Sequence, residues 1–420
     1  MEITGKRFLI TQPMMHWICG STIVTLELAE YLKSQGAKVT IYTCFYDEPL
    51  KSICQKRKIK VHESKNRPQY KLTDFDYIWV HSQILPLSLV EALGKKLPSK
   101  MPAFIFLHMS GMDWIPDEKP WIYNLENLLS SKSLFICEEI KKVNQPMLDK
   151  NIDTGYFENP APLSFAQRTA PPKSKLHDIL IISNHPPQEI EKAKQILRTK
   201  HHVNVQSLGE DEELYKILDI NTLSQFDAVI TIAKTATYCL VSGTPVYVYD
   251  SFGGGVGWLT KDNFKQAKKR NFSGYQNKFY PDYIGGGFVK KTAEQIVKEI
   301  LTGYANALKY QTTNQPKFQK EFIINEIFPQ LLANIQPRQD IQKFPSDYKD
   351  MVLASQDLAN KHFEWASIIH NLDDIIENLN NQNSYLQDQI QELKSALSAK
   401  SYQLYSKLIT PYQKIKAKKQ

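Results

Sequence analysis

Apolar positions in the first three quarters of the chain follow two periods in turn. Short apolar or β-branched runs, such as Phe8–Thr11 and Tyr77–Val80, predict buried strands. Between such runs, residues 21–35 and similar stretches carry apolar residues three or four positions apart, which predicts helices. Strands that alternate with helices are typical of a parallel sheet covered on both faces. The pattern therefore predicts an α/β fold.

This alternation occurs twice, on either side of a proline-rich, polar stretch. Residues 159–176 contain that stretch and are predicted to be a linker. They separate an N-terminal Rossmann-like domain, residues 1–158, from a C-terminal Rossmann-like domain, residues 177–335. Two helices, about Thr292–Lys309 and Lys317–Asn334, are expected to close the globular part of the chain. A cleft between two domains is a favoured ligand site.

A different period begins after the second domain. Residues 336–400 carry leucines seven positions apart, with isoleucines at the intervening core positions, and this repeat predicts a coiled coil. Isoleucine and leucine at alternate core positions favour two parallel strands, and Asn383 at a core position favours a dimer. The core positions are Ile369, Leu372, Ile376, Leu379, Asn383, Leu386, Ile390, Leu393 and Leu397.

The C-terminal residues carry a marked excess of positive charge. Seven lysines and no acidic residue lie between residues 393 and 420, so the net charge of +8 leaves about +1 for the other 392 residues. No nucleic-acid partner is expected. Residues 401–420 form a basic, aromatic tail in which Pro411 is predicted to break the helix. The tail is expected to lie on an anionic membrane surface, or else to be a solvated terminus.

The N-terminal sequence and the cysteine content lead us to expect a protein of the cell interior. The N-terminus lacks the pattern of a signal peptide, and no apolar run approaches the ~20 residues that span a bilayer. The five cysteines are scattered, which favours reduced thiols in a cytosol. A cytoplasmic protein, peripheral at the inner face of the membrane, is the resulting expectation.

The stretch 226–274 carries the clearest chemistry. An apolar strand, Ala228–Ile232, is followed by a helix, Lys234–Ser242, and a second strand, Val246–Tyr249. The two strand ends are expected to face one crevice beyond a parallel sheet. Helix N-termini bind phosphate and glycines let a backbone approach a ligand, so a nucleotide-diphosphate site is predicted. Its donor-binding residues are Lys234, Thr235, Thr237, Asp250, Gly253, Gly254 and Gly255.

The segment KTATYCLVSGTPVYVYDSFGGGVGWLTKDNF, followed by NFSG, resembles the second domain of bacterial glycosyltransferases with the GT-B fold. Those enzymes build surface polysaccharide. The resemblance implies two doubly wound Rossmann-like domains, a nucleotide-sugar donor as substrate, and a surface-glycan or lipid-linked oligosaccharide acceptor. No other cofactor is expected. No metal is expected either, because no His/Cys/Asp cluster has the spacing of ligands.

Further candidates lie at other predicted strand ends. Gly20 and Ser21 would lie near the donor phosphates, or form a plain turn with a helix cap. His108 ends the strand AFIFLH, where the resemblance implies a histidine that faces the sugar; a structural role is the alternative. Asp113 is a weaker catalytic candidate. Asn184 and His185 would reach the nucleotide or cap a helix.

Two motifs do not fit the expected pattern. Asp74 and Asp76 match an Asp-x-Asp metal motif, but they precede a strand and are expected to be solvated strand-entry residues. Many retaining enzymes of this fold carry two glutamates eight positions apart, and here Ile230 and Tyr238 occupy those places. A sugar-nucleotide epimerase of the same fold and a non-catalytic coiled-coil scaffold of a polysaccharide-assembly complex therefore remain as alternatives.

Overall fold

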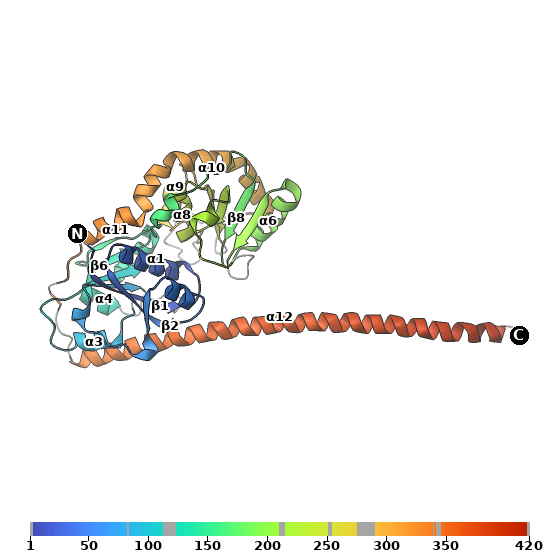
Figure 1. Ribbon diagram of the computed structural model, residues 1–420, viewed down its shortest axis with the longest axis horizontal. Helices are drawn as coiled ribbons and strands as arrows, with labels where there is room; N and C mark the ends of the chain where they lie inside the picture. Colours follow the sequence, from blue (N-terminus) through green and yellow to red (C-terminus); the bar gives the residue numbers. More distant parts are fainter. Residues whose placement is uncertain are drawn as a thin grey trace. The chain divides into compact units, whose positions relative to one another are not determined.

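A computed structural model describes residues 3–81, 84–111, 123–209, 215–250, 254–274, 290–338, 340–341 and 346–417 (Figure 1). It contains a seven-stranded and a five-stranded sheet whose strands alternate with helices along the chain. The predicted α/β class with parallel sheets is confirmed.

The first sheet has strand order β3-β2-β1-β4-β5-β6-β7, and every pair of neighbouring strands is parallel. Reversal of the strand order between β1 and β4 creates a topological switch point there. The sequence did not predict β3, β6 or β7. The strands are β1 (Arg7–Met15), β2 (Lys38–Tyr46), β3 (Lys60–Glu63), β4 (Tyr77–His81), β5 (Ala103–His108), β6 (Ser130–Phe135) and β7 (Thr154–Tyr156).

Alternate residues of β1 point to opposite faces of this sheet, as the strand period requires. Phe8 and Ile10 belong to the apolar core on one face and Leu9 to the core on the other. Both faces are therefore covered, mainly by α1 (Gly20–Ser34), α2 (Leu50–Lys56), α3 (Leu87–Leu93), α4 (Tyr123–Leu129) and α5 (Glu138–Asn144).

The second sheet has strand order β12-β11-β10-β8-β9, with a switch point between β8 and β10. All its pairs are parallel except β11 with β12. Its strands are β8 (Asp178–Ile182), β9 (Asn204–Leu208), β10 (Ala228–Thr231), β11 (Val246–Asp250) and β12 (Gly254–Trp258). Its helices are α6 (Gln188–His201), α7 (Ile220–Leu223), α8 (Ala233–Ser242), α9 (Phe264–Lys269) and α10 (Ala293–Phe322).

The chain crosses between the two sheets at two adjacent places. Ala161 pairs with Ile323 in an isolated bridge, and its amide donates to the Phe322 carbonyl at 2.6 Å. Helix α10 runs through Pro316 and ends at Phe322, because Ile323 adopts an extended conformation. The sequence predicted an earlier end, at about Lys309. Helix α11 (Ile324–Ala333) then buries Phe328 in the core of the first domain.

Helix α12 (Ser346–Ala417) begins on the first domain, where Val352 and Phe363 join its core. The Gln356 side chain accepts a hydrogen bond from the Leu85 amide at 3.0 Å. The chain divides into two compact units at this helix, Met1–Phe363 and Glu364–Gln420. The predicted break at Pro411 is wrong, since the helix continues to Ala417.

The second unit exposes the predicted heptad core. Exposed fractions of its isoleucine and leucine core positions run from 50% at Ile390 to 71% at Leu397. A long helix is confirmed, and its pairing with a second strand stays a prediction. Across the helices that the structure describes, none combines the length and the apolar character needed to cross a bilayer.

Candidate functional site

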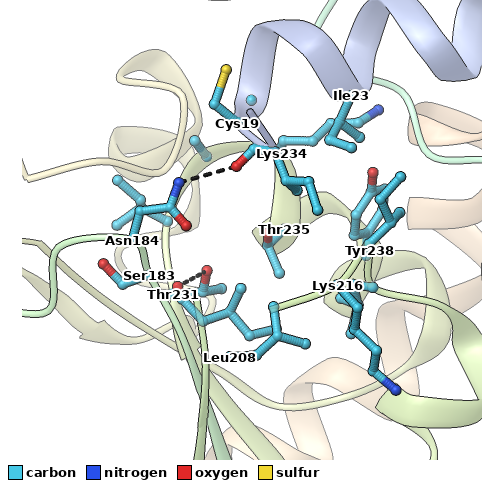
Figure 2. Close-up of a pocket in the computed structure, with 17 residues that line it drawn as sticks. Cys19, Ile23, Ser183, Asn184, Leu208, Lys216, Thr231, Lys234, Thr235 and Tyr238 are labelled. Carbon is cyan, nitrogen blue, oxygen red and sulfur yellow. Dashed lines mark hydrogen bonds between the residues drawn. The ribbon is translucent and has the colours of Figure 1, made fainter. Parts of the chain in front are cut away.

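A cavity of about 230 Å³ lies between the two domains of the first unit. Residues that follow β8 and β10, such as Ser183 and Ala233, line it at the switch point of the second sheet. The first domain contributes Ile18–Gly20 and Ile23, from the β1–α1 loop and the start of α1. Figure 2 shows Cys19 and Ile23 on one side of the cavity and Leu208 and Thr231 on the other.

Side chains of the second domain hold the β1–α1 loop over this cavity. The amide of Ile18 donates to the Tyr215 hydroxyl at 3.0 Å, and the Ile18 carbonyl accepts from the Asn184 side chain at 3.0 Å (Figure 2). Both backbone groups of one residue are therefore satisfied across the domain boundary. The loop that closes the cavity depends on the second domain for its position.

The first turn of α8 lies at the cavity with an unusual backbone. Ala233 has φ +52°, a left-handed backbone conformation that residues other than glycine rarely adopt. Its amide donates to the carbonyl of Phe272, which also has a positive φ, of +52°. Strain of this kind persists where the surrounding structure demands it, often at functional sites. The turn aims the N-terminus of α8 at the cavity, where a helix favours an anion.

A buried ion pair joins the two domains behind the cavity wall. Glu27 Oε2, on α1, lies 2.6 Å from Lys234 Nζ, on α8, and both side chains are less than one-tenth exposed. The Tyr238 hydroxyl donates to Glu27 Oε1, and the Tyr238 ring stacks on Phe165 with centroids 4.0 Å apart. Lys234 and Tyr238 also line the cavity.

Burial acts on both members of this pair toward neutrality. It raises the pKa of the Glu27 carboxyl, although the Lys234 ammonium and the Tyr238 hydroxyl act in the opposite direction. It lowers the pKa of the Lys234 ammonium, and Glu27 opposes that shift. Each charge therefore depends on the other to persist in this environment.

The same helix also holds the linker. Lys234 Nζ donates to the Pro160 carbonyl, and the Thr237 hydroxyl donates to the Asn159 carbonyl at 2.8 Å. Asn159 and Pro160 directly precede the first chain crossing at Ala161. The N-terminus of α8 thus contacts the cavity, the first domain and the linker.

The structure brings four of the predicted donor-binding residues to this one cavity: Gly20, Asn184, Lys234 and Thr235. Ser21 lies beside Gly20 and accepts a hydrogen bond from the Gln12 side chain at 3.2 Å. His185 is exposed, and its amide donates to the Ser183 hydroxyl at 3.1 Å. The Thr237 hydroxyl is occupied with the linker.

The predicted glycine loop lies partly in strand β12. Asp250 accepts a hydrogen bond from the Gly274 amide at 2.5 Å. A Cβ atom on Gly255 would lie 2.0 Å from the Val248 carbonyl oxygen, so this glycine permits close pairing of β12 with β11. Gly254 has φ +79°. Gly253 lies outside the described residues. The close approach at Gly255 is thus between the backbones of two strands of the protein.

The predicted catalytic histidine lies at the carboxyl end of β5 in a buried pair. His108 Nε2 is 2.8 Å from Glu126 Oε1, and the same oxygen accepts from the Ser133 hydroxyl at 2.6 Å. A carboxylate that holds one ring nitrogen fixes the orientation of the imidazole. Asp113 lies outside the described residues.

The Asp-x-Asp motif has structural partners at the amino end of β4. Partial burial of Asp76 would raise its pKa, but hydrogen bonds from Arg7 and Lys100 outweigh this and lower the pKa to about 2. Asp74 accepts from the Lys71 amide at 2.8 Å. Within the described residues, no group of three or more His, Cys, Asp or Glu side chains could hold a metal ion.

Sequence reasoning missed two contributors to the site, Glu27 and Tyr215. Glu27 lies on a helix whose neighbouring positions Ile23, Leu26 and Leu28 are apolar, and an acidic residue there signals a buried partner. Tyr215 lies in a stretch of the sequence that shows no helical or strand period. Its role depends on where the second domain meets Ile18.

No family model matches the sequence, and no curated protein matches it. Among solved structures, a glycosyltransferase from Rickettsia africae ESF-5 matches with a TM-score of 0.50 and 14% identity, over 78% of this chain and 97% of that chain. TarM (TM-score 0.47, 11% identity) and the lipopolysaccharide outer core galactosyltransferase WaaB (0.46, 13%) each match over 79% of this chain and 99% of their own. The similarity to the Rickettsia protein shows a shared fold, the two-domain GT-B fold that the sequence resemblance implied.

Proposed function

We propose that the protein is a glycosyltransferase that moves a sugar from a nucleotide-sugar donor to a surface-glycan or lipid-linked oligosaccharide acceptor. The observation that supports this most is the interdomain cavity at the switch point of the second sheet, onto which the N-terminus of α8 opens. Open α/β sheets bind ligands at such points, and a helix N-terminus there suits a diphosphate.

The donor side of the proposal rests on charge. Lys216 and Lys234 line the cavity, and no carboxylate does so among the described lining residues. We assign direct contact with the diphosphate to Thr235 and the first amides of α8. Lys234 supplies positive charge from a position already fixed by Glu27, and this charge would stabilise the departing diphosphate.

The acceptor side rests on the first domain. His108 lies at the carboxyl end of β5, next to β4 at the edge where the β1–α1 loop also emerges. We propose that it acts at the sugar, with Glu126 holding its ring. Asp113 stays a secondary candidate for this role.

The two alternatives make different demands. A sugar-nucleotide epimerase needs acid and base carboxylates facing the reacting sugar, and none lines the cavity in the part of the chain that is described. A non-catalytic scaffold needs the helix α12 and no ligand in the cavity. Nucleotide binding therefore separates the transferase from the scaffold.

We further propose that the protein works as a parallel dimer, held by its tail at the inner face of the cytoplasmic membrane. The exposed heptad core of α12 supports pairing, because a contiguous apolar stripe on a soluble surface usually marks an interface. The lysines of residues 401–420 support attraction to anionic lipid.

The test uses the isosteric pair Thr235→Glu and Thr235→Gln in the full chain. Both side chains have the same size, but only glutamate places a negative charge at the N-terminus of α8. Thermal shift and calorimetry with UDP, GDP, ADP and their sugar conjugates would identify the nucleotide, and release of free sugar or nucleoside diphosphate would report turnover.

The glutamate variant should bind the selected nucleotide at least about tenfold more weakly than the glutamine variant, or ~1.4 kcal/mol. Its helix should stay folded, because an acid in the first turn suits the helix dipole. Equal affinities of the two variants would remove the diphosphate from this position. A wild-type protein that binds none of the nucleotides would favour the scaffold.

A further inference from the structure

Positive charge outside the tail is concentrated in one segment of the first domain. Residues 49–73 carry eight basic side chains and one acidic side chain, a net charge of +7. Residues 393–420 also carry +7, and the whole chain carries +8, so the remaining residues are net acidic, at −6. Residues 336–392 account for that −6, so the two domains, residues 1–335, carry a net charge of +7 that equals the charge of this one segment.

This segment forms one edge of the first sheet. It contains α2, β3 and a turn of 3-10 helix, Ser64–Asn66, and β3 is the last strand in the order of the sheet. Helix α2 packs beside β3, and the 3-10 turn packs beside β2. Consecutive elements thus bring the basic side chains to one margin of the domain.

Six of the eight basic side chains are exposed and free of ion pairs to any residue that the structure describes. We call these six residues the basic edge. They are Lys51, Lys56, Lys58, Lys60, Arg67 and Lys71.

The other two basic side chains are paired with carboxylates. Arg57 pairs with Glu30 at 2.8 Å, and Lys65 pairs with Glu63 at 2.7 Å. Lys33 adds a further ammonium, since its Nζ donates to the carbonyl of Lys58 at 2.6 Å. The charge of the basic edge is therefore not neutralised from within its own surroundings.

Acidic residues flanking the segment are also engaged locally. Glu48 accepts from the amide and hydroxyl of Ser52, and Asp47 accepts from the Glu48 amide. Asp74 accepts from the backbone of Lys71. These contacts hold the turns at both ends of the segment and leave the lysine side chains to solvent.

Protection of an edge strand explains only part of this arrangement. Lysine on an edge strand prevents pairing with another chain. However, only Lys60 of the basic edge lies on β3; the others lie on α2, in the following turns or in the loop after β3. A partner that carries negative charge over an extended surface accounts for all six.

The chemistry of the edge favours lipid headgroups over nucleic acid. Five of its six residues are lysines, which act as point charges rather than as the planar forks that read bases. Within the described residues, no large apolar side chain between positions 49 and 73 is exposed. Tyr70 is occupied, with its hydroxyl 2.6 Å from His62 Nδ1 and its ring against Phe75, so no platform for stacked bases is present.

We propose that the basic edge binds the anionic lipid headgroups of a membrane surface. Each basic residue held near such a surface raises the partition of a protein about fivefold, and the effects of several residues multiply. This attraction is separate from that of the tail and requires no glycosyl transfer. It would keep the first domain, which we propose to bind the acceptor, at the lipid surface.

The experiment uses full-length protein whose five tail lysines from Lys407 onward are replaced by glutamine, so that only other surfaces contribute. An edge variant adds Lys51→Gln, Lys58→Gln, Lys60→Gln and Arg67→Gln. A matched control instead adds Lys298→Gln, Lys309→Gln, Lys317→Gln and Lys320→Gln, which removes the same charge from exposed positions of α10. Sedimentation with phosphatidylcholine vesicles, with and without phosphatidylglycerol, measures binding at low and high ionic strength.

The tail-neutral protein and the control should bind phosphatidylglycerol vesicles at low ionic strength and release them at high ionic strength. The edge variant should bind at least about thirtyfold more weakly, with an unchanged melting temperature. The proposal is overturned if the tail-neutral protein ignores these vesicles, or if the edge and control variants bind equally. Binding of polyphosphate with no binding of vesicles would also overturn it.

Discussion

Among single residues, Glu27 determines how Lys234 faces the cavity. The carboxylate lies 2.6 Å from the ammonium, and both side chains are less than one-tenth exposed. Removing one member of a buried pair leaves the other charge without compensation, which commonly costs about 3–5 kcal/mol. Replacing both by apolar residues of similar size avoids that cost.

We therefore expect Glu27→Leu to lower the free energy of unfolding by about 3–5 kcal/mol, and Glu27→Leu with Lys234→Met to recover most of the loss. Urea unfolding of Glu27→Leu, of Lys234→Met and of the double variant gives the coupling free energy between the two side chains. A loss below ~1 kcal/mol for Glu27→Leu would mean that the pair adds little to stability.

Glu139 predicts a pH dependence of stability. Burial raises its pKa to about 7 from 4.5, although Arg270 of the second domain and Lys142 act in the opposite direction. A carboxyl with a higher pKa in the folded protein holds its proton more tightly there. Its stabilising effect is present below pH 4.5 and is lost as the pH rises to about 7.

The free energy of unfolding should accordingly fall by up to about 3 kcal/mol across this window, and Glu139→Gln should flatten the fall. Urea unfolding at a series of pH values measures both. Parallel pH profiles for the wild type and Glu139→Gln would assign the dependence to other groups.

His108 carries the catalytic part of the proposed function. Its imidazole is held by Glu126 at 2.8 Å, at the carboxyl end of β5. His108→Ala should lower turnover about 100-fold or more and leave nucleotide affinity nearly unchanged, because its role is at the sugar. Steady-state kinetics and calorimetry on one preparation separate the two effects. Activity within a few-fold of wild type would make His108 a packing residue.

At the scale of elements, the pairing of β11 with β12 depends on one glycine. A Cβ atom at Gly255 would lie 2.0 Å from a backbone oxygen, whereas nothing lies within 4 Å of a Cβ atom at Gly20. Gly255→Ala forces the backbone of a buried strand to move, and movement of backbone is costlier than a shift of a flexible side chain.

We expect Gly255→Ala to lower the free energy of unfolding by more than ~2 kcal/mol, and Gly20→Ala to change it by less than ~0.5 kcal/mol. Thermal and urea unfolding of both variants provide the measurement. Similar stabilities would show that β12 can separate from β11 without loss of the domain. Because Gly20 lines the cavity, its variant also reports whether a ligand approaches that backbone.

Helices α10 and α11 show how tertiary contacts set the ends of elements. Proline usually ends a helix, yet α10 continues through Pro316, and Phe318 and Phe322 beyond it are buried. The helix ends at Ile323, where pairing with Ala161 supplies other backbone partners. Burial of the last two turns outweighs the hydrogen bond that the proline removes.

For the whole molecule, the exposed core positions of α12 predict the oligomeric state. Ile376 and Leu379 are 54% and 58% exposed in one chain, and a second α12 would bury the whole stripe. Analytical ultracentrifugation should give a dimer. Asn383→Ile should broaden the distribution toward higher oligomers, because the polar core residue that favours two strands is gone.

Asn381→Ile makes the same chemical change at a position that the heptad count places outside the core. The Asn381→Ile protein should therefore remain a dimer. A full-length protein that sediments as a monomer at micromolar concentration would contradict the pairing. Equal effects of the two substitutions would show that Asn383 does not occupy a core position.

The class of fold, the approximate places of most strands and helices, and the helical heptad region could be predicted from the amino-acid sequence alone. These features depend on residues close together in the chain, whose apolar period follows from the geometry of a strand or a helix. The N-terminus of α8 was recognised in the same way, since its strand, turn and helix are consecutive. The resemblance that implied the GT-B fold also rested on this continuous stretch.

The remaining features depend on contacts between residues far apart in the chain. Strands β3 and β12 carry too few apolar side chains for a period to show, because one is a polar edge and the other is built around glycines. Glu27 and Tyr238 are 211 positions apart, and Ile18 and Tyr215 are 197 apart. Such partners meet only when the two domains pack together, and no local pattern encodes which surfaces will face each other.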